Sequence, residues 1–506
     1  MKQICLILFL LTFLLPNFGF GQNTFSKRLN FGFPSVVLTS VETNDSCFYI
    51  CGLVADTLYP YNSGLLFAKY NFEGDLQYVK TLNDTSKTYE AWQNTLIPTS
   101  DGNFIMSGLS LDENMKGLLM KLTPGGDTLF LKKFESPYIL ENPFIRDEDL
   151  IILPDKGFAS VYTIQKSNFD INILLIRTDS LGQVLWQKIY GGPEDEAPHS
   201  IIPTDDGGFI IGAGAQEGGY LFKVDSLGDI EWEYILPFSE SSINPFNNLH
   251  QLEDESLIVT SAFWTDIGQG IIAPNNVVLR IDSDQELLWT TTFKDSFPGI
   301  FTKLDKILPL PDNQHFLAAG SGYGVVNGEW QFLGKLIKAS YEGDSIWTRY
   351  YHYVENHLAQ NLLYDLEATP DGGFIMCGQA KDNQAMPTEP NQQGWLLKVD
   401  EHGCLVPGCQ LSTSITNEQP PVPFQLKLYP NPVSESLNIY FRQEQASGNA
   451  QFRIIDVSGI LMQQFDSTFS DVTHIVDVRR YSAGVYFLQY WAEGRLLKTE
   501  KFEVFH

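Results

Sequence analysis

The sequence predicts an all-β protein, a seven-bladed β-propeller followed by a small C-terminal β-sandwich. Three observations lead to this prediction. A pattern that starts with a basic residue and ends with an aromatic one recurs along most of the 506 residues, Asp-Gly turns accompany its copies, and a separate set of alternating strands follows a proline-rich segment. Four-stranded units repeated at such a period are typical of propellers, because one four-stranded sheet cannot bury both of its faces.

The N-terminus has the features of a secretory signal peptide. Lys2 precedes an apolar run from Ile4 to Leu15, and small residues then offer a cleavage site between Gly21 and Gln22. The 12 residues of this run are too few to cross a bilayer core of about 30 Å. We therefore expect residues 1–21 to be removed and the mature chain to have no membrane span.

The recurring pattern has seven copies, whose spacing runs from 46 to 60 residues. Each copy starts with a basic residue, in order Lys69, Lys121, Arg177, Lys223, Arg280, Lys338 and Lys398. Six copies have an aromatic residue nine positions later, and the seventh has Pro407; the aromatic residues are Tyr78, Phe130, Trp186, Trp232, Trp289 and Trp347. We expect these aromatic side chains to occupy equivalent places and to pack between neighbouring sheets.

Each copy is predicted to form four short strands joined by turns rich in Asp and Gly. In the fourth copy the strands are expected at 200–203, 209–214, 220–224 and 230–236, and the Asp-Gly sequence that starts at Asp206 marks a hairpin. The propeller is expected to span residues 22–409. A solenoid is the alternative repeat architecture, but it would not need four strands in each copy.

The seventh copy stops after its third strand, near Val399. The missing fourth strand is expected to come from the N-terminal segment 25–32, whose Phe31-Gly32 matches Tyr190-Gly191 of the third copy. Such an exchange would join the first and last sheets and remove an open edge.

A second domain is expected after a linker at 410–425, which holds Pro420, Pro421 and Pro423. Six alternating strands between 426 and 504 predict a small β-sandwich over residues 426–506.

Four sequence motifs in this region resemble the type A sorting domain of the type IX secretion system. The motifs are Leu428-Tyr-Pro-Asn-Pro432, Ile455-Asp-Val-Ser-Gly459, Ala483-Gly-Val-Tyr-Phe-Leu488 and Lys501-Phe-Glu-Val504, and the likeness covers residues 424–506. The resemblance implies a protein that is secreted or displayed on the outer cell surface, with the type IX translocon and its sorting peptidase as partners. The sorting residues it implies are Tyr429, Pro430, Asn431, Pro432, Asp456, Gly459, Gly484, Val485, Tyr486 and Lys501. Residues 25–409 are similar to WD40-like and quinoprotein-like propellers, which supports the fold and no activity.

Charge and cysteine content narrow the function. The formal net charge is −28, and residues 424–506 contribute only −1, so nearly all of the negative charge lies on the propeller. Such an acidic surface repels phosphate backbones, which argues against nucleic acid as a partner. Cys404 and Cys409 bracket Leu-Val-Pro-Gly, a sequence suited to a type II turn, which makes a disulfide possible. Cys47 and Cys51, four residues apart in one strand, lie too far apart to be bridged.

No catalytic, cofactor-binding or metal-binding constellation stands out. The Asp-Ser-Leu-Gly sequence at Asp179 differs from a sialidase Asp-box by one residue, and the acidic turn at Asp282 lacks the glycine and glutamate of a calcium loop. We expect the repeated basic residues to pair with acidic residues two to four positions away rather than to bind an anion. The predicted function is non-catalytic binding of an extracellular protein or glycan, and the alternative is a secreted enzyme that degrades polysaccharide or protein.

Overall fold

The computed structural model describes residues 22–506, except for residues 45, 56–62, 83–87, 92–94, 112–113, 139–144, 168–169, 193–194, 216–217, 238–245, 267–271, 294–301, 386–390, 407, 412–423, 444–449, 457–460, 468–471, 493–494 and 506. The predicted signal peptide, including Gly21, and most of the predicted linker therefore lie outside the described residues. The chain divides into two compact units, Met1–Leu405 and Val406–His506. Both are built from strands, and the only helical segment among the described residues is a 3-10 turn, Cys409–Leu411.

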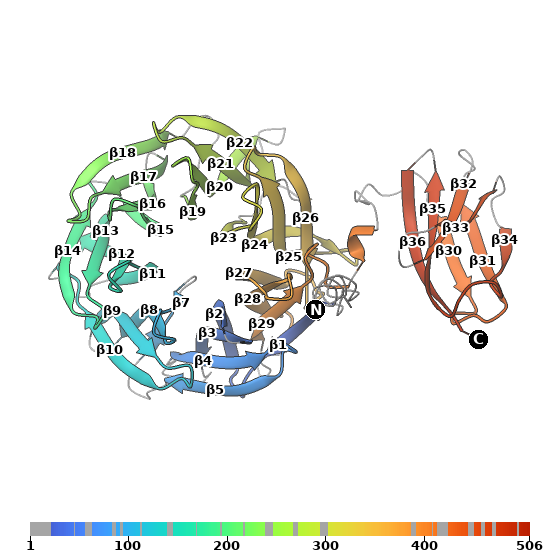
Figure 1. Cartoon of the computed structure of the whole chain (residues 1–506), viewed down its shortest axis with the longest axis horizontal. Coiled ribbons are helices and arrows are strands. Elements are labelled where there is room, and N and C mark those ends of the chain that lie inside the picture. Colours follow the sequence, from blue (N-terminus) through green and yellow to red (C-terminus); the bar gives the residue numbers. More distant parts are fainter. Residues whose placement is uncertain are drawn as a thin grey trace, which may run out of the picture. The chain divides into compact units, whose positions relative to one another are not determined.

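The first unit is a ring of antiparallel sheets arranged around a central axis (Figure 1). Successive groups of strands run from the inside of the ring to its outside. The first group consists of β2 (Ser35–Asn44), β3 (Cys47–Ala55), β4 (Ser63–Asn71) and β5 (Leu76–Leu82). The second group consists of β6 (Thr88–Glu90) and β7 (Leu96–Pro98), which both pair with β8 (Phe104–Leu111), and then β9 (Met115–Leu122) and β10 (Thr128–Phe134).

The next three groups are separate four-stranded sheets. They are β11 (Ile145–Ile152), β12 (Phe158–Ser167), β13 (Asp170–Thr178) and β14 (Val184–Tyr190); β15 (Glu196–Pro203), β16 (Phe209–Ala215), β17 (Gly218–Val224) and β18 (Ile230–Pro237); and β19 (Asn248–Gln251), β20 (Leu257–Asp266), β21 (Ile272–Ile281) and β22 (Leu287–Phe293).

The remaining strands complete the ring. They are β23 (Leu304–Pro309), β24 (His315–Val326), β25 (Glu329–Ser340) and β26 (Ser345–Tyr351), then β27 (Gln360–Ala368), β28 (Phe374–Lys381) and β29 (Gln392–Val399). Single parallel pairs, Phe332 with Gln360 and Ser35 with Gln392, link these groups to each other and to the first group. Buried aliphatic and aromatic side chains fill the spaces between neighbouring groups, as in the cluster shared by β11–β14 and β15–β18.

The N-terminal strand β1 (Phe25–Leu29) pairs antiparallel with β29, with Phe25 opposite Lys398 and Leu29 opposite Gly394. The predicted closing segment, residues 25–32, therefore contains the strand that pairs with β29. Its predicted register was wrong, however. In the third group Tyr190 is opposite Ile173, four residues after the Trp186–Arg177 pair, so the residue in Tyr190's place is Leu29 and not Phe31.

The repeated basic and aromatic residues face each other across the two outermost strands of each group. Tyr78 is opposite Lys69, Phe130 opposite Lys121, Trp186 opposite Arg177, Trp232 opposite Lys223, Trp289 opposite Arg280 and Trp347 opposite Lys338. Phe25 is the seventh member, because β1 places it opposite Lys398.

The second unit contains two antiparallel sheets. One has the order β30 (Phe424–Tyr429), β31 (Ser436–Gln443), β34 (Val472–Asp477), and the other has the order β33 (Leu461–Ser467), β32 (Ala450–Asp456), β35 (Gly484–Ala492), β36 (Arg495–Val504). Side chains of both sheets meet in one core, where the Phe441 and Phe452 rings lie 5.2 Å apart.

Candidate functional site

The repeated basic residues are held by ion pairs that belong to the fold. Among the described residues, five of them pair with an aspartate of the preceding hairpin turn: Lys121 with Asp101, Arg177 with Asp155, Lys223 with Asp206, Arg280 with Asp254 and Lys398 with Asp371. The prediction of acidic partners two to four residues away was wrong, because the hairpin turn brings a more distant aspartate to the same end of the sheet.

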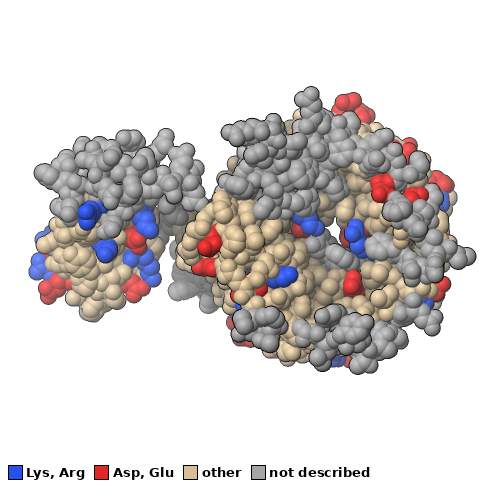
Figure 2. Space-filling model, turned by 180° about the vertical axis from the view of Figure 1, so that it is seen from behind, with Lys and Arg blue, Asp and Glu red and all other residues tan. Residues whose placement is uncertain are grey.

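The innermost strands carry a β-bulge at equivalent positions. In β2, β11, β15, β23 and β27 the pairing register shifts by one residue, and the extra residues are Thr39, Glu148, His199, Asp305 and Tyr364. A bulge re-aims the side chains around it. Because these strands surround the central axis, a set of polar side chains gathers there, and Figure 2 shows a central hollow with charged side chains of both signs around it.

The residue after the bulge joins neighbouring groups. Asp149 accepts hydrogen bonds from the backbone N–H groups of Ile201 and Leu150, both at 2.9 Å. Asp365 does the same with Val41 and Leu366, also at 2.9 Å. At the corresponding place Asn248 accepts one bond, from the N–H of Ile307 at 3.0 Å. These buried side chains therefore link neighbouring sheets through hydrogen bonds.

Charged side chains of opposite sign meet within the hollow. The ammonium group of Lys306 lies 3.3 Å from a carboxylate oxygen of Asp365 and 3.9 Å from one of Glu367. Lys303 pairs with Asp305 at 2.5 Å, and Arg146 with Glu148 at 2.5 Å. These contacts satisfy charges that would otherwise be costly to bury.

The electrostatic coupling runs across the hollow. Burial lowers the pKa of His199 to about 3, and the charge of Lys303, which immediately precedes β23, adds to this shift. Burial raises the pKa of Glu148, while Arg146 and Lys303 oppose the rise. Burial works to lower the pKa of Lys306, but the surrounding carboxylates raise it on balance. The hollow is thus one connected set of titratable groups.

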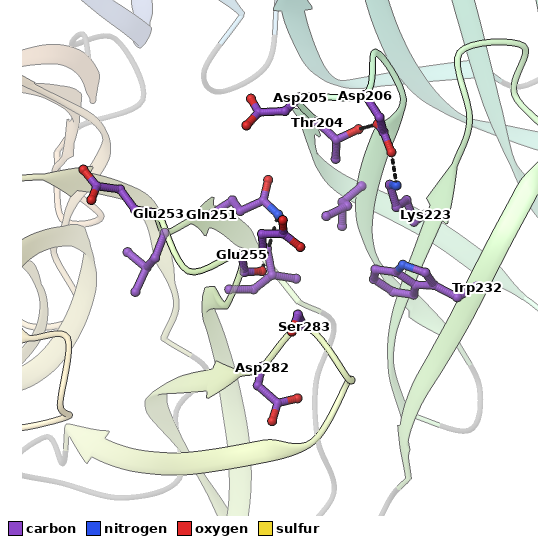
Figure 3. Close-up of a pocket in the computed structure, with 13 residues that line it drawn as sticks. Thr204, Asp205, Asp206, Lys223, Trp232, Gln251, Glu253, Glu255, Asp282 and Ser283 are labelled. Atoms are coloured by element: carbon purple, nitrogen blue, oxygen red, sulfur yellow. Dashed lines mark hydrogen bonds and ion pairs between the residues drawn. The ribbon is translucent and has the colours of Figure 1, made fainter.

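A separate pocket lies on the hairpin end of the ring, between the groups β15–β18 and β19–β22. It has a volume of about 300 Å³. Its polar and aromatic lining consists of Thr204, Asp205, Asp206, Lys223, Trp232, Gln251, Glu253, Glu255, Asp282 and Ser283. Figure 3 shows Gln251 and Glu255 facing Lys223 and Trp232 across the pocket.

One local departure from the repeat explains why Trp232 borders a pocket. At the other boundaries the aromatic residue packs on a positive-φ glycine of the next group, and at most of them a Cβ atom added to the glycine would come too close to the ring, at 2.9 Å for Gly182 and Phe130. The glycines are Gly74, Gly126, Gly182, Gly228, Gly343 and Gly403. The turn that follows Trp232 has Gln285 at this place, with φ +64°. Trp232 therefore faces a cavity lined by Asp282 and Ser283 of that turn.

The pocket is acidic. Five carboxylates line it, and Lys223 is its one basic side chain. Lys223 pairs with Asp206 and, at 2.6 Å, with Glu231, so its charge is already compensated. The Lys223 and Thr204 hydrogen bonds lower the pKa of Asp206 to about 2. The pocket therefore presents a half-buried indole beside negative charge.

The described part of the chain offers neither a candidate metal cluster nor a candidate membrane-spanning helix. It contains no group of three or more His, Cys, Asp or Glu side chains that could hold a metal ion. No helix in it is long and apolar enough to cross a membrane.

The sorting residues predicted in the second unit converge at one end of its sheets. Asn431 accepts from the N–H of Glu503 at 2.9 Å and donates to the Lys501 carbonyl at 3.0 Å, so its amide ties the β30 end to β36. Asp456 pairs in register with Tyr486, and Gly484 with Val504. Tyr429 and Lys501 are exposed, and Pro430 and Pro432 flank Asn431. Gly459 lies outside the described residues.

Gly484 has no glycine-specific backbone conformation. It begins β35, its φ lies outside the left-handed region, and a Cβ atom added to it would meet nothing within 4 Å. The fold therefore gives no reason for glycine at this position. Val485, next to it, is half-buried.

The cysteines fall into two sets. Cys404 and Cys409 are disulfide-bonded. Between them the N–H of Cys409 donates to the Val406 carbonyl at 3.3 Å, and Gly408 has φ +91°, as the third residue of a type II turn requires. Cys47, Cys51 and Cys377 are free.

The family comparison identifies the second unit. Residues 427–504 match the model of the secretion system C-terminal sorting domain. These residues are a type IX secretion sorting domain. The protein is accordingly secreted, and is attached to the outer cell surface or released. The sorting domain also implies interaction with the type IX secretion machinery.

The solved structures that resemble the chain share little sequence with it. A periplasmic gluconolactonase from Pseudomonas aeruginosa is 11% identical, with a TM-score of 0.40, over 65% of this chain and 87% of that one. An α-L-arabinanase from Penicillium chrysogenum is 10% identical, with a TM-score of 0.41, over 75% and 98%. The endosialidase of phage phi92 is 10% identical, with a TM-score of 0.38, over 80% and 73%. None of the curated proteins compared with the chain matches it.

These names correct one expectation. The sequence predicted that the chain is not an enzyme, but the gluconolactonase, the arabinanase and the endosialidase that resemble it are enzymes, and they contradict that prediction. Their low identity and TM-scores assign no reaction to this chain.

Proposed function

We propose that this protein is a seven-bladed β-propeller carried to the cell exterior by the type IX secretion system, and that the propeller binds an extracellular protein or glycan in the pocket beside Trp232. The propeller comprises residues 22–409 after removal of a signal peptide at Gly21. A linker at 410–425 and a β-sandwich at 426–506 follow. In the sandwich, Asn431 and the residues that converge with it at β36 engage the translocon and its sorting peptidase.

The observation that carries the binding function is the cavity of about 300 Å³ that Trp232 lines. At equivalent boundaries a glycine turn packs on the aromatic ring, whereas beside Trp232 the corresponding turn has Gln285 in place of the glycine. Concave sites that combine an aromatic surface with a few polar side chains are typical of ligand binding. Gln251 and Glu255 supply those polar groups.

A screen of the mature protein against arrays of glycans and extracellular proteins tests the binding function. Ligands that it retains are then measured with Trp232→Phe and with Trp289→Phe, which changes an aromatic residue covered by Gly343. We expect weaker binding only for Trp232→Phe. Ligands that bind both variants like the parent protein would contradict a site at this pocket.

Hydrolysis in the central hollow is a second candidate function. Burial raises the pKa of both Glu148 and Asp305, and His199 lies beside Glu148, with 3.8 Å between its Nδ1 atom and a carboxylate oxygen. A buried carboxyl group whose pKa is raised, with an imidazole beside it, can serve in general acid–base catalysis. Release of new chain ends from polysaccharide or protein, abolished by Glu148→Gln and retained by Glu401→Gln, is the result expected of an enzyme.

A further inference from the structure

We infer that the pocket beside Trp232 selects an organic cation, namely a lysine or arginine side chain of an extracellular polypeptide. This inference rests on the proposed binding function and names its ligand class.

The charge of the pocket excludes anionic ligands. Asp205, Asp206, Glu253, Glu255 and Asp282 line it. Of the ion pairs between described residues, only that of Lys223 with Asp206 places a base on one of these carboxylates. An anion that entered the pocket would be repelled by the uncompensated negative charge of these carboxylates, whereas a cation would neutralise part of that charge.

Two of the carboxylates are held in place by hydrogen bonds from neutral donors. Asp282 accepts from the N–H groups of Asp284 and Glu286 at 3.0 and 2.8 Å, which fixes it in its turn. Glu253 accepts from the Asn313 amide at 3.2 Å. Neutral donors hold these two carboxylates without adding a cation, so the negative charge of the site is pre-organised.

The indole ring supplies a second element of cation recognition. Trp232 is half-buried and lines the same cavity as Glu255 and Asp282. A cation above an indole face is attracted by the ring quadrupole, and tryptophan is the strongest such partner. Lys223 lies opposite Trp232 in the strand register but is engaged by Asp206 and Glu231, so the ring is not committed to an internal cation.

The surroundings favour a polypeptide over an amino sugar as the source of the cation. Leu227 and Ile230, which precede Trp232 on the same hairpin, are 64% and 47% exposed, and Leu288 on the neighbouring outer strand is 51% exposed. Exposed apolar side chains on the two hairpins that contribute to the pocket suit a peptide that carries both basic and apolar residues. The overall charge of −28 further steers basic polypeptides toward the protein.

Isothermal titration of the full mature chain tests the ligand class. The probes are a short peptide of alternating lysine and leucine, the same peptide with lysine replaced by glutamate, and an oligomer of glucosamine. The variant Asp205→Asn/Glu255→Gln removes two pocket charges, and Glu73→Gln/Glu401→Gln removes two charges from exposed turns elsewhere on the ring.

We expect the lysine peptide to bind and the glutamate peptide not to bind. The pocket variant should weaken binding by roughly threefold to tenfold, as the loss of two exposed charge contacts implies, while the turn variant should change it less than twofold. Trp232→Phe should weaken it further. Equal losses in the two charge variants would show attraction by net charge alone and would overturn the inference. Tighter binding of the glucosamine oligomer, lost in the pocket variant, would overturn the peptide as ligand but leave the proposed binding function intact. If a ligand from the array screen binds every pocket variant as tightly as it binds the parent protein, that result would overturn both the inference and the proposed binding function.

Discussion

Phe25 lies opposite Lys398, in the place that Trp186 occupies opposite Arg177 and Trp289 occupies opposite Arg280. The ring of Phe25 also packs on Gly74 of the first group, 2.7 Å from the position of an added Cβ atom. One residue near the N-terminus therefore supplies both the last aromatic–basic pair and the contact between the last and first groups.

Removing this contact should loosen the ring. Phe25→Ala is expected to lower the free energy of unfolding by about 1–3 kcal/mol, less than the cost for a fully buried phenylalanine because Phe25 is half-buried. A chain that starts at Ser35 should lose more, since it lacks all of β1. Thermal melting followed by circular dichroism measures both, with Leu288→Ala at an exposed position as the control. Unchanged melting of the truncated chain would argue against closure by β1.

The hydrogen bonds that Asp149 accepts from Ile201 and Leu150 predict a second stability effect. Asp149→Asn keeps one acceptor oxygen but places an NH₂ group against a backbone N–H, so we expect a loss of about 1–3 kcal/mol. Asp127→Asn, at a side chain that is 76% exposed, should change stability by less than about 0.5 kcal/mol. Urea unfolding monitored by tryptophan fluorescence compares the two variants. Equal free energies of unfolding for the two variants would mean that the hydrogen bonds of Asp149 contribute little to stability.

The hollow should make stability depend on pH. Burial raises the pKa of Glu367 from 4.5 to about 7, with Asp365 adding to the shift and Lys306 opposing it. The folded state then binds a proton that the unfolded state has released, so the contribution of Glu367 is complete below pH 4.5 and is lost as the pH rises through about 7. His199, with its pKa lowered to about 3, acts in the opposite direction below pH 6.5.

Glu367→Gln isolates the first effect. Between pH 5 and 8 its free energy of unfolding should fall less steeply than that of the parent protein, and Glu401→Gln should match the parent slope. Chemical denaturation at four pH values gives these slopes. Parallel curves for all three proteins would rule out Glu367 as a source of the dependence.

Export provides the fourth prediction. Deletion of Phe424–His506 should leave a folded, protease-resistant propeller in the periplasm, because the first unit has its own cores and the sorting domain lies in the second. Blots of medium, cell surface and periplasm locate the protein, and the mass of the surface form should correspond to an end within 410–425. Secretion of the deletion variant at the parent level would contradict the need for the sorting domain.

The repeat pattern predicted the strand groups well, because each depends on local residues. Asp-Gly sequences set the hairpins, and the basic and aromatic positions define two facing strands. The sorting residues were also readable, since they form short contiguous motifs. The exact register of β1 was missed, because Phe25 reaches its partner only through ring closure. The sequence nevertheless holds a signal for it: Lys27 follows Phe25 by two residues, as Lys80 follows Tyr78 and Lys188 follows Trp186.

The polar set in the hollow was missed for a different reason. Glu148, His199 and Asp305 share a bulge position but no residue type, so no repeated letter marks them. The pocket left one readable signal. The fifth copy has Gln285 where most copies have glycine, and this absence could have singled out Trp232.

The pairing of β1 with β29 also governs when the ring can form during export. A chain that emerges N-terminus first presents Phe25 early, yet its partner strand Gln392–Val399 emerges after almost all the rest of the ring. Until then the first strand has no place to dock and the last edge stays open. Completion of this unit is thus a late event that depends on sequence-distant contacts, which makes folding slow relative to local hairpin formation.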